Sequence, residues 1–113
     1  MTVTAKNLVP AKLVENTQTT QYIVSSNITA TIIDKFTATN YSASAATLSV
    51  NLVTSLDNPG NANLVVKTVS IQPGQTYLFP ELIGHVMVSG GTLSTIASAA
   101  TAISIRASGR TIS

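Results

Sequence analysis

The chain has 113 residues, of which 44% are hydrophobic and 9% charged, with six Lys and Arg against four Asp and Glu and a net charge of +2. This length suits one domain with its own core. The low content of charged residues, together with the high content of hydrophobic residues, excludes intrinsic disorder. The absence of cysteine excludes a disulfide framework, a zinc–thiolate site and thiol chemistry.

The N-terminal residues 1–21 are the least core-like part of the chain, with a Val9-Pro10 kink and a strand predicted over Ala11–Val14. Two interpretations stay open: a first strand with a loose terminus, or an arm that pairs with or is clamped by a neighbouring subunit. We therefore treat residues 1–21 as an arm and first strand, and residues 22–113 as the main domain. The residues expected to contact a partner are Leu8, Val9, Leu13 and Tyr41.

The next strands are predicted over Tyr22–Val24 and over Ile28–Thr39, which is rich in Thr and Ile. Strict alternation along the second strand places Asp34 on the same face as Ile32 and Phe36. Either a bulge between Ile32 and Ile33 resets the alternation, or Asp34 is buried and hydrogen-bonded. We expect the bulge, because a lone buried carboxylate is costly.

Apolar and polar residues alternate most cleanly where Leu48, Val50 and Leu52 each follow a polar residue. The same alternation of apolar and polar residues recurs from Ile103 to Ser108. Turns are predicted at 57–61, 72–75 and 89–91, where Gly, Pro, Asn and Asp gather. The stretch Leu93–Ala102 could form a short helix, but its surroundings favour a strand and a loop. The remaining predicted strands are Leu64–Ile71, Thr76–Phe79, Leu82–Val88 and Thr92–Ala97.

The spacing of these strands predicts the fold class. Strands that recur about every 8–12 residues are typical of a sandwich or barrel. We expect an all-β chain with a single antiparallel β-sandwich of about seven or eight strands, either jelly-roll or immunoglobulin-like. A surface so poor in charge lacks the usual protection against edge-to-edge pairing, so much of it is expected to be covered by other subunits of a homo-oligomer.

Residues able to carry catalysis are few. His85 is the single histidine, and Glu81 lies roughly 13 Å away if the segment is extended, too far for a hydrogen bond. The four carboxylates show no paired spacing, and Asp57-Asn58 lacks the twelfth-position acid of a calcium loop. We therefore predict no catalytic residues, no cofactor, no metal site and no enzymatic activity.

The basic residues are spread along the sequence, and only Arg106 and Arg110 lie close together. A phosphate-binding surface needs several clustered cations, so no nucleic-acid partner is expected. The N-terminus has no signal-peptide pattern, and apolar runs reach only about three residues, far short of the ~20 that cross a bilayer. We expect no membrane partner and synthesis in a cytoplasm.

Three segments together resemble small virion proteins of tailed bacteriophages: the strand pair within 33–52, the Pro-Gly turn in Val69–Tyr77, and the closing strands within 91–109. The resemblance covers about residues 20–112. It implies a structural role in the virion, made in the cytoplasm of a bacterial host. The first expectation is a capsid decoration (cement) protein that clamps major capsid subunits as a dimer or trimer. The alternative is a tail, head-fibre or receptor-binding component.

Overall fold

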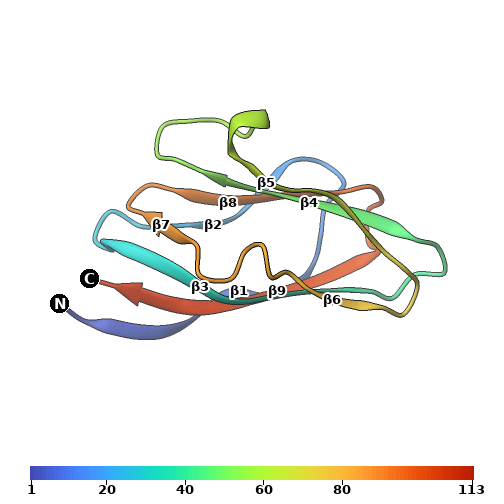
Figure 1. Cartoon of the computed structure of the whole chain (residues 1–113), viewed down its shortest axis with the longest axis horizontal. Coiled ribbons are helices and arrows are strands. Elements are labelled where there is room, and N and C mark those ends of the chain that lie inside the picture. Colours follow the sequence, from blue (N-terminus) through green and yellow to red (C-terminus); the bar gives the residue numbers. More distant parts are fainter.

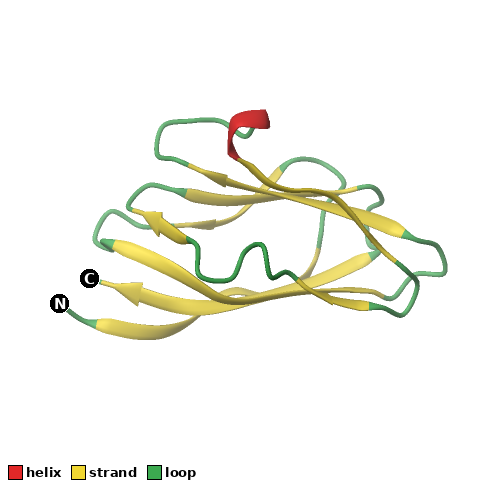
Figure 2. Ribbon diagram, viewed as in Figure 1, coloured by secondary structure: helices red, strands yellow, loops and turns green.

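The computed structural model describes residues 1–113 and contains nine strands and one short 3₁₀ turn (Figures 1 and 2). The predicted all-β class is confirmed. In chain order the elements are β1 (Val3–Leu13), β2 (Thr19–Ile23), β3 (Ala30–Asn40), β4 (Ala46–Val53), η1 (Asn61–Asn63), β5 (Leu64–Ile71), β6 (Thr76–Leu78), β7 (Val86–Val88), β8 (Thr92–Ala97) and β9 (Ile103–Ile112).

The strands form two antiparallel sheets, drawn as the lower and upper layers in Figure 1. Sheet A has the order β1-β9-β3, with β6 and β7 both paired to the far edge of β3, and sheet B has the order β2-β8-β4-β5. The pairs are nested along the chain: β1 with β9, β2 with β8, β3 with β6 and β7, and β4 with β5. A nested hairpin rolled into two facing sheets is a jelly roll, so the structure selects the first of the two predicted sandwich types.

One edge of sheet A is a broken strand, which corrects the strand predicted over Leu82–Val88. Residues 79–85 leave the sheet between β6 and β7 and are drawn as a winding loop in Figure 2. Pro80 has no N–H to donate to a ladder, and Gly84 has a positive φ of 86° that turns the chain back. Phe79 and Leu82 both enter the core from this loop with fully buried side chains, so its apolar residues reflect packing, not a strand.

β3 contains a bulge, as predicted, but the bulge lies at Asp34 and not between Ile32 and Ile33. Ile33 and Lys35 pair with the consecutive β9 residues Gly109 and Ser108, so Asp34 is the extra residue. Ile33 faces the core before the bulge and Phe36 after it, whereas Asp34 is exposed. The bulge thus keeps the carboxylate in water without interrupting the apolar face.

The core lies between the sheets, and four of the five aromatic side chains belong to it or pack against it. Phe79 packs edge-to-face on Phe36, with ring centroids 5.2 Å apart, and on Tyr77, at 4.7 Å. Tyr22 is half-buried, and its hydroxyl lies 3.1 Å from that of Thr31 on the opposite sheet. Every buried side-chain nitrogen and oxygen has a hydrogen-bond partner, as native cores require.

The N-terminal segment is part of sheet A. β1 runs beside β9 from Val3 to Leu13 with two register shifts, the first between Asn7 and Val9. That irregularity turns Leu8 and Val9 both inward, and their side chains are 4% and 0% exposed. Residues 3–13 therefore form an edge strand of this sheet, longer than the strand predicted over Ala11–Val14.

Candidate interaction surface

The residues considered for catalysis do not come together in the fold. His85 is exposed at the end of the loop 79–85, where its backbone carbonyl accepts from the Ile33 N–H at 3.1 Å. The Tyr77 hydroxyl donates to Glu81 at 3.2 Å, and burial together with this carboxylate raises the pKa of Tyr77. No group of three or more His, Cys, Asp or Glu side chains lies close enough to hold a metal ion. No helix of this structure has the length and apolar character to cross a membrane.

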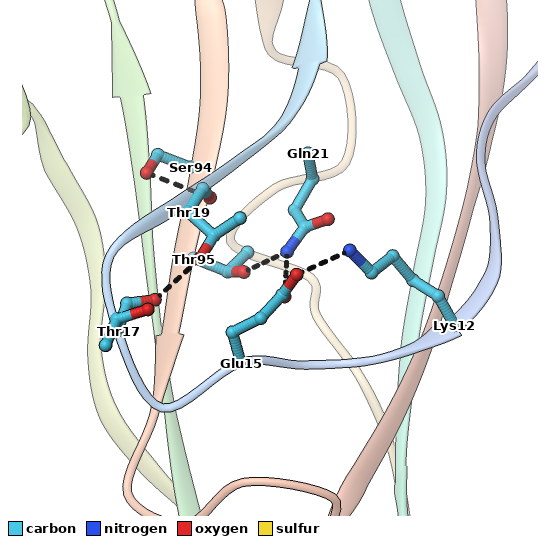
Figure 3. Close-up of polar contacts among 7 residues, drawn as sticks. All are labelled: Lys12, Glu15, Thr17, Thr19, Gln21, Ser94 and Thr95. Carbon is cyan, nitrogen blue, oxygen red and sulfur yellow. Dashed lines mark hydrogen bonds and ion pairs between the residues drawn. The ribbon is translucent and has the colours of Figure 1, made fainter.

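One polar network reaches between the sheets, at the β1–β2 connection (Figure 3). Glu15 accepts from Lys12 Nζ at 2.9 Å and from Gln21 Nε2 at 3.0 Å. The same Gln21 nitrogen donates at 3.0 Å to the hydroxyl of Thr95, a fully buried residue of β8. These contacts link β1 of sheet A to β2 and β8 of sheet B.

The geometry of this network assigns it a structural role. The hydrogen bonds from Lys12 and Gln21 hold the pKa of Glu15 below its ordinary value, so the carboxylate stays ionised and accepts only. The Glu15 backbone carbonyl also accepts from the Ala97 N–H at 3.1 Å, which extends the connection along β8. The network thus closes one side of the sandwich and satisfies the buried Thr95 hydroxyl.

The outer face of sheet A carries an apolar patch at the end of the sheet where the two termini lie. The strand register aligns two rows across this face. One row runs Val3, Ile112, Ala30, Val88, and the next runs Ala5, Arg110, Ile32, Val86. We define the apolar patch as the seven apolar residues of these rows: Val3, Ala5, Ala30, Ile32, Val86, Val88 and Ile112.

The patch is open to solvent, since Val3, Val86 and Val88 are 53%, 58% and 55% exposed. At the border of the patch, the Arg110 guanidinium forms a bidentate contact with Asp34, with an Nη2–Oδ1 distance of 2.9 Å. An apolar groove of about 90 Å³ lies beside the apolar patch, between β7 and the end of β4. Ligand pockets usually exceed about 300 Å³, so this groove is small and the patch is better suited to a protein surface.

The other half of the same face is polar and basic. Beyond the Asp34–Arg110 pair, the rows contain Lys35 opposite Ser108 and Thr37 opposite Arg106. Both cations are exposed, and neither forms an ion pair. Sheet A therefore presents two chemically different halves, one apolar and one cationic.

The structure separates the four predicted partner contacts into two groups. Leu8 and Val9 are buried in the core of this chain, so for these two the expectation is corrected: the bulge in β1 turns both side chains inward. Leu13 and Tyr41 are 41% and 60% exposed, so both are accessible, and their role as partner contacts stays a prediction.

The sequence contains one indication of the apolar patch that the strand predictions did not use. Val86 and Val88 alternate with Met87, and Ile32 alternates with Ile33, so both faces of these strands are apolar. A half-exposed strand normally has polar residues on its outer face. Apolar residues on both faces of a strand therefore indicate a covered outer face.

No family model matches the sequence, and a search of curated proteins finds no match. Among solved structures the chain is similar to a chain in the structure of infectious bursal disease virus, Gx strain. The TM-score is 0.58 at 14% sequence identity, and the match covers 98% of this chain and 33% of that one. The present chain thus spans about a third of the length of the viral chain, and the likeness supports the two-sheet fold.

Proposed function

We propose that this protein is a structural component of a virus particle that works by packing against neighbouring subunits and carries out no catalysis. The observation that carries the proposal is the jelly roll, which is similar over nearly its whole length to a chain of a virus structure. Jelly rolls also occur in lectins and cupins, so the fold leaves other functions open. The apolar patch supplies the second argument, because exposed apolar area of this kind marks protein contacts.

The occupant we propose for the apolar patch is a second copy of this chain. A two-fold contact places the same patch against itself, and such a patch must be self-complementary. The seven apolar residues meet that condition, and the patch borders one acid and one base, Asp34 and Arg110, whose contact is exposed. In a two-fold contact, Arg110 of one copy can lie against Asp34 of the other.

Sedimentation velocity over a range of concentrations tests this proposal. The parent protein is expected to form a dimer or larger assembly, and Val88→Lys is expected to remain monomeric because it places a cation in the patch. Ile23→Lys is the matched control: Ile23 is 60% exposed, but it lies on β2 of the other sheet. A parent protein that stays monomeric at all concentrations, or equal loss in both variants, would contradict the proposed contact.

Within this role we favour a capsid decoration protein that clamps major capsid subunits of a tailed bacteriophage, located in the virion. This finer assignment is supported by the resemblance of the strand and turn segments within residues 20–112. The alternative is a tail, head-fibre or receptor-binding component. Saturable co-sedimentation with undecorated phage capsids, with a rise in their melting temperature, supports decoration. Binding to cell envelopes or glycans instead supports the alternative.

A further inference from the structure

The basic half of sheet A contains a depression lined only by polar side chains. It has a volume of about 240 Å³, and its four lining residues are Lys35 and Thr37 from β3 with Arg106 and Ser108 from β9. Lys35 lies opposite Ser108 and Thr37 opposite Arg106, so the two cations occupy one diagonal and the two hydroxyls the other. Diagonal cross-strand neighbours are within reach of long side chains.

The two cations lack a neutralising partner. The structure contains two ion pairs, Lys12–Glu15 and Arg110–Asp34, and neither includes Lys35 or Arg106. Asp34, which directly precedes Lys35, has both carboxylate oxygens on Arg110 at 2.9 to 3.2 Å. Two neighbouring cations repel each other, and a bound anion would remove that repulsion.

The hydrogen-bonding groups in the depression are free to donate. The Lys35 ammonium, the Arg106 guanidinium and the Ser108 hydroxyl make no hydrogen bond within the chain, and Thr37 donates only weakly, at 3.5 Å, to the Arg106 carbonyl. These donors converge from four side chains with no acceptor carboxylate among them. A tetrahedral oxyanion has enough oxygens to accept from all four, whereas a carboxylate has two.

The backbone under the depression is held on both sides. β3 and β9 are inner strands of sheet A, flanked by β1 on one side and by β6 and β7 on the other. Phe36 and Ala107, the inward-facing residues between the four side chains, are fully or almost fully buried. The donors therefore project from a rigid support, which lowers the entropic cost of binding.

A second depression, of about 390 Å³, shares Arg106 and Ser108 and continues across β9 to Ala5, Lys6 and Asn7. Asp34 also lines it, with its carboxylate paired to Arg110. Lys6, Lys35, Arg106 and Arg110 are four of the six basic residues of the chain, and they belong to the three adjacent strands β1, β9 and β3. The sheet thus gathers cations that are far apart in the sequence.

We propose that the depression formed by Lys35, Thr37, Arg106 and Ser108 binds a phosphate group. Lysine and arginine supply charge, and the serine and threonine hydroxyls supply hydrogen bonds, the side-chain types that contact phosphates in nucleic-acid complexes. The phosphate is either free or part of a phosphodiester chain, in which case the second depression receives the next group along the chain. This site is separate from the apolar patch and does not depend on the proposed virion role.

The test is a titration of the ¹⁵N-labelled protein with inorganic phosphate, followed by amide chemical shifts. Saturable shifts are expected at 35–37 and 106–108, and Arg106→Ala and Lys35→Ala should each weaken binding at least tenfold. Lys67→Ala is the control, since Lys67 is an exposed cation on β5 of the other sheet, and it should bind like the parent.

Two further probes identify the source of the phosphate. A short single-stranded oligonucleotide that binds more tightly than phosphate, with affinity falling as salt rises, shows a phosphodiester ligand. Equal affinity for both shows a free phosphate. Absence of saturable shifts with either probe, or equal binding of an oligoglutamate peptide at the same residues, would overturn the proposal. The Val88→Lys variant should bind phosphate normally, so failure of one proposal leaves the other standing.

Discussion

Asn40 is the side chain on which three segments of the chain converge. Its amide nitrogen donates to the backbone carbonyls of Ser44 and Ile71, each at 2.8 Å. Its amide oxygen accepts from the Ser42 N–H at 2.9 Å and from the Ser42 hydroxyl at 2.7 Å. Asn40 is fully buried, so these bonds replace water and fix the β3–β4 turn against the end of β5.

Replacing Asn40 with alanine is expected to lower the free energy of unfolding by about 2–3 kcal/mol, because it leaves the buried Ile71 carbonyl without its donor. Urea denaturation followed by circular dichroism measures the change. Ser42→Ala is the comparison variant. It removes the contacts of a half-buried hydroxyl with the Asn40 amide oxygen and the Ser44 carbonyl, and should cost below about 1 kcal/mol. Similar losses in the two variants would show that Asn40 does not bridge the turn and β5 as described.

Among the elements, β1 has the clearest consequence for stability. It covers one edge of β9, and its Leu8 and Val9 side chains are part of the core. Deleting residues 1–10 should therefore markedly lower the melting temperature, or prevent folding, since it exposes a strand edge and empties two core positions.

Thermal melts and solubility of the truncated chain measure this effect. Deleting only Met1, which precedes the strand and is fully exposed, serves as the control and should shift the melting temperature little. A 1–10 deletion that melts with the parent protein would mean that β1 contributes nothing to the sandwich and acts as an arm after all.

The strands that local patterns predicted best are those with one apolar face and clear turns at both ends. The prediction for Leu64–Ile71 matches β5 at both bounds, because Pro73 and Gly74 stop it and Gly74 turns the chain with a φ of 78°. The strand predicted over Leu82–Val88 is wrong for residues 82–85, because Leu82 and Ile83 resemble strand residues locally. Only the position of the loop beside the β3 bulge shows that Leu82 packs into the core.

The two surface sites were harder to predict than the strands because each depends on pairing between distant segments. Alternation indicates that Lys35 and Thr37 share a face, but not that Arg106 lies opposite Thr37. The bulge at Asp34 also shifts the register of β3 against β9, and no local pattern predicts at which residue this shift occurs. The scattered cations of the sequence therefore become a cluster only when the register of β3 and β9 is known.

At the scale of the whole molecule, the few ionised groups give stability a defined dependence on pH. Lys12 lowers the pKa of Glu15, and Arg110 lowers that of Asp34. A carboxyl whose pKa is lower in the folded than in the unfolded state stabilises the fold at pH values above its unfolded-state pKa. It loses that contribution as the pH falls through its folded-state pKa. The melting temperature should therefore stay level above about pH 5 and fall below about pH 4, where ordinary carboxyls titrate.

The double variant Glu15→Gln, Asp34→Asn should have a flatter melting profile in this acid range. Asp57→Asn is the control, because Asp57 lies in the exposed β4–β5 loop and forms no ion pair. Differential scanning calorimetry from pH 3 to pH 7 compares the three proteins. An acid response of the double variant as steep as that of the parent would assign the loss of stability to other groups.

The chain begins and finishes at one place, where Thr2 and Ser113 exchange two backbone hydrogen bonds of 2.7 and 2.9 Å. Val3 and Ile112, the next residues inward, belong to the apolar patch. An affinity tag or fluorescent protein fused to either terminus would therefore emerge at the border of that patch and shield it. Labels for imaging are better inserted at Asn58–Gly60 in the β4–β5 loop, whose residues are exposed and belong to the other sheet.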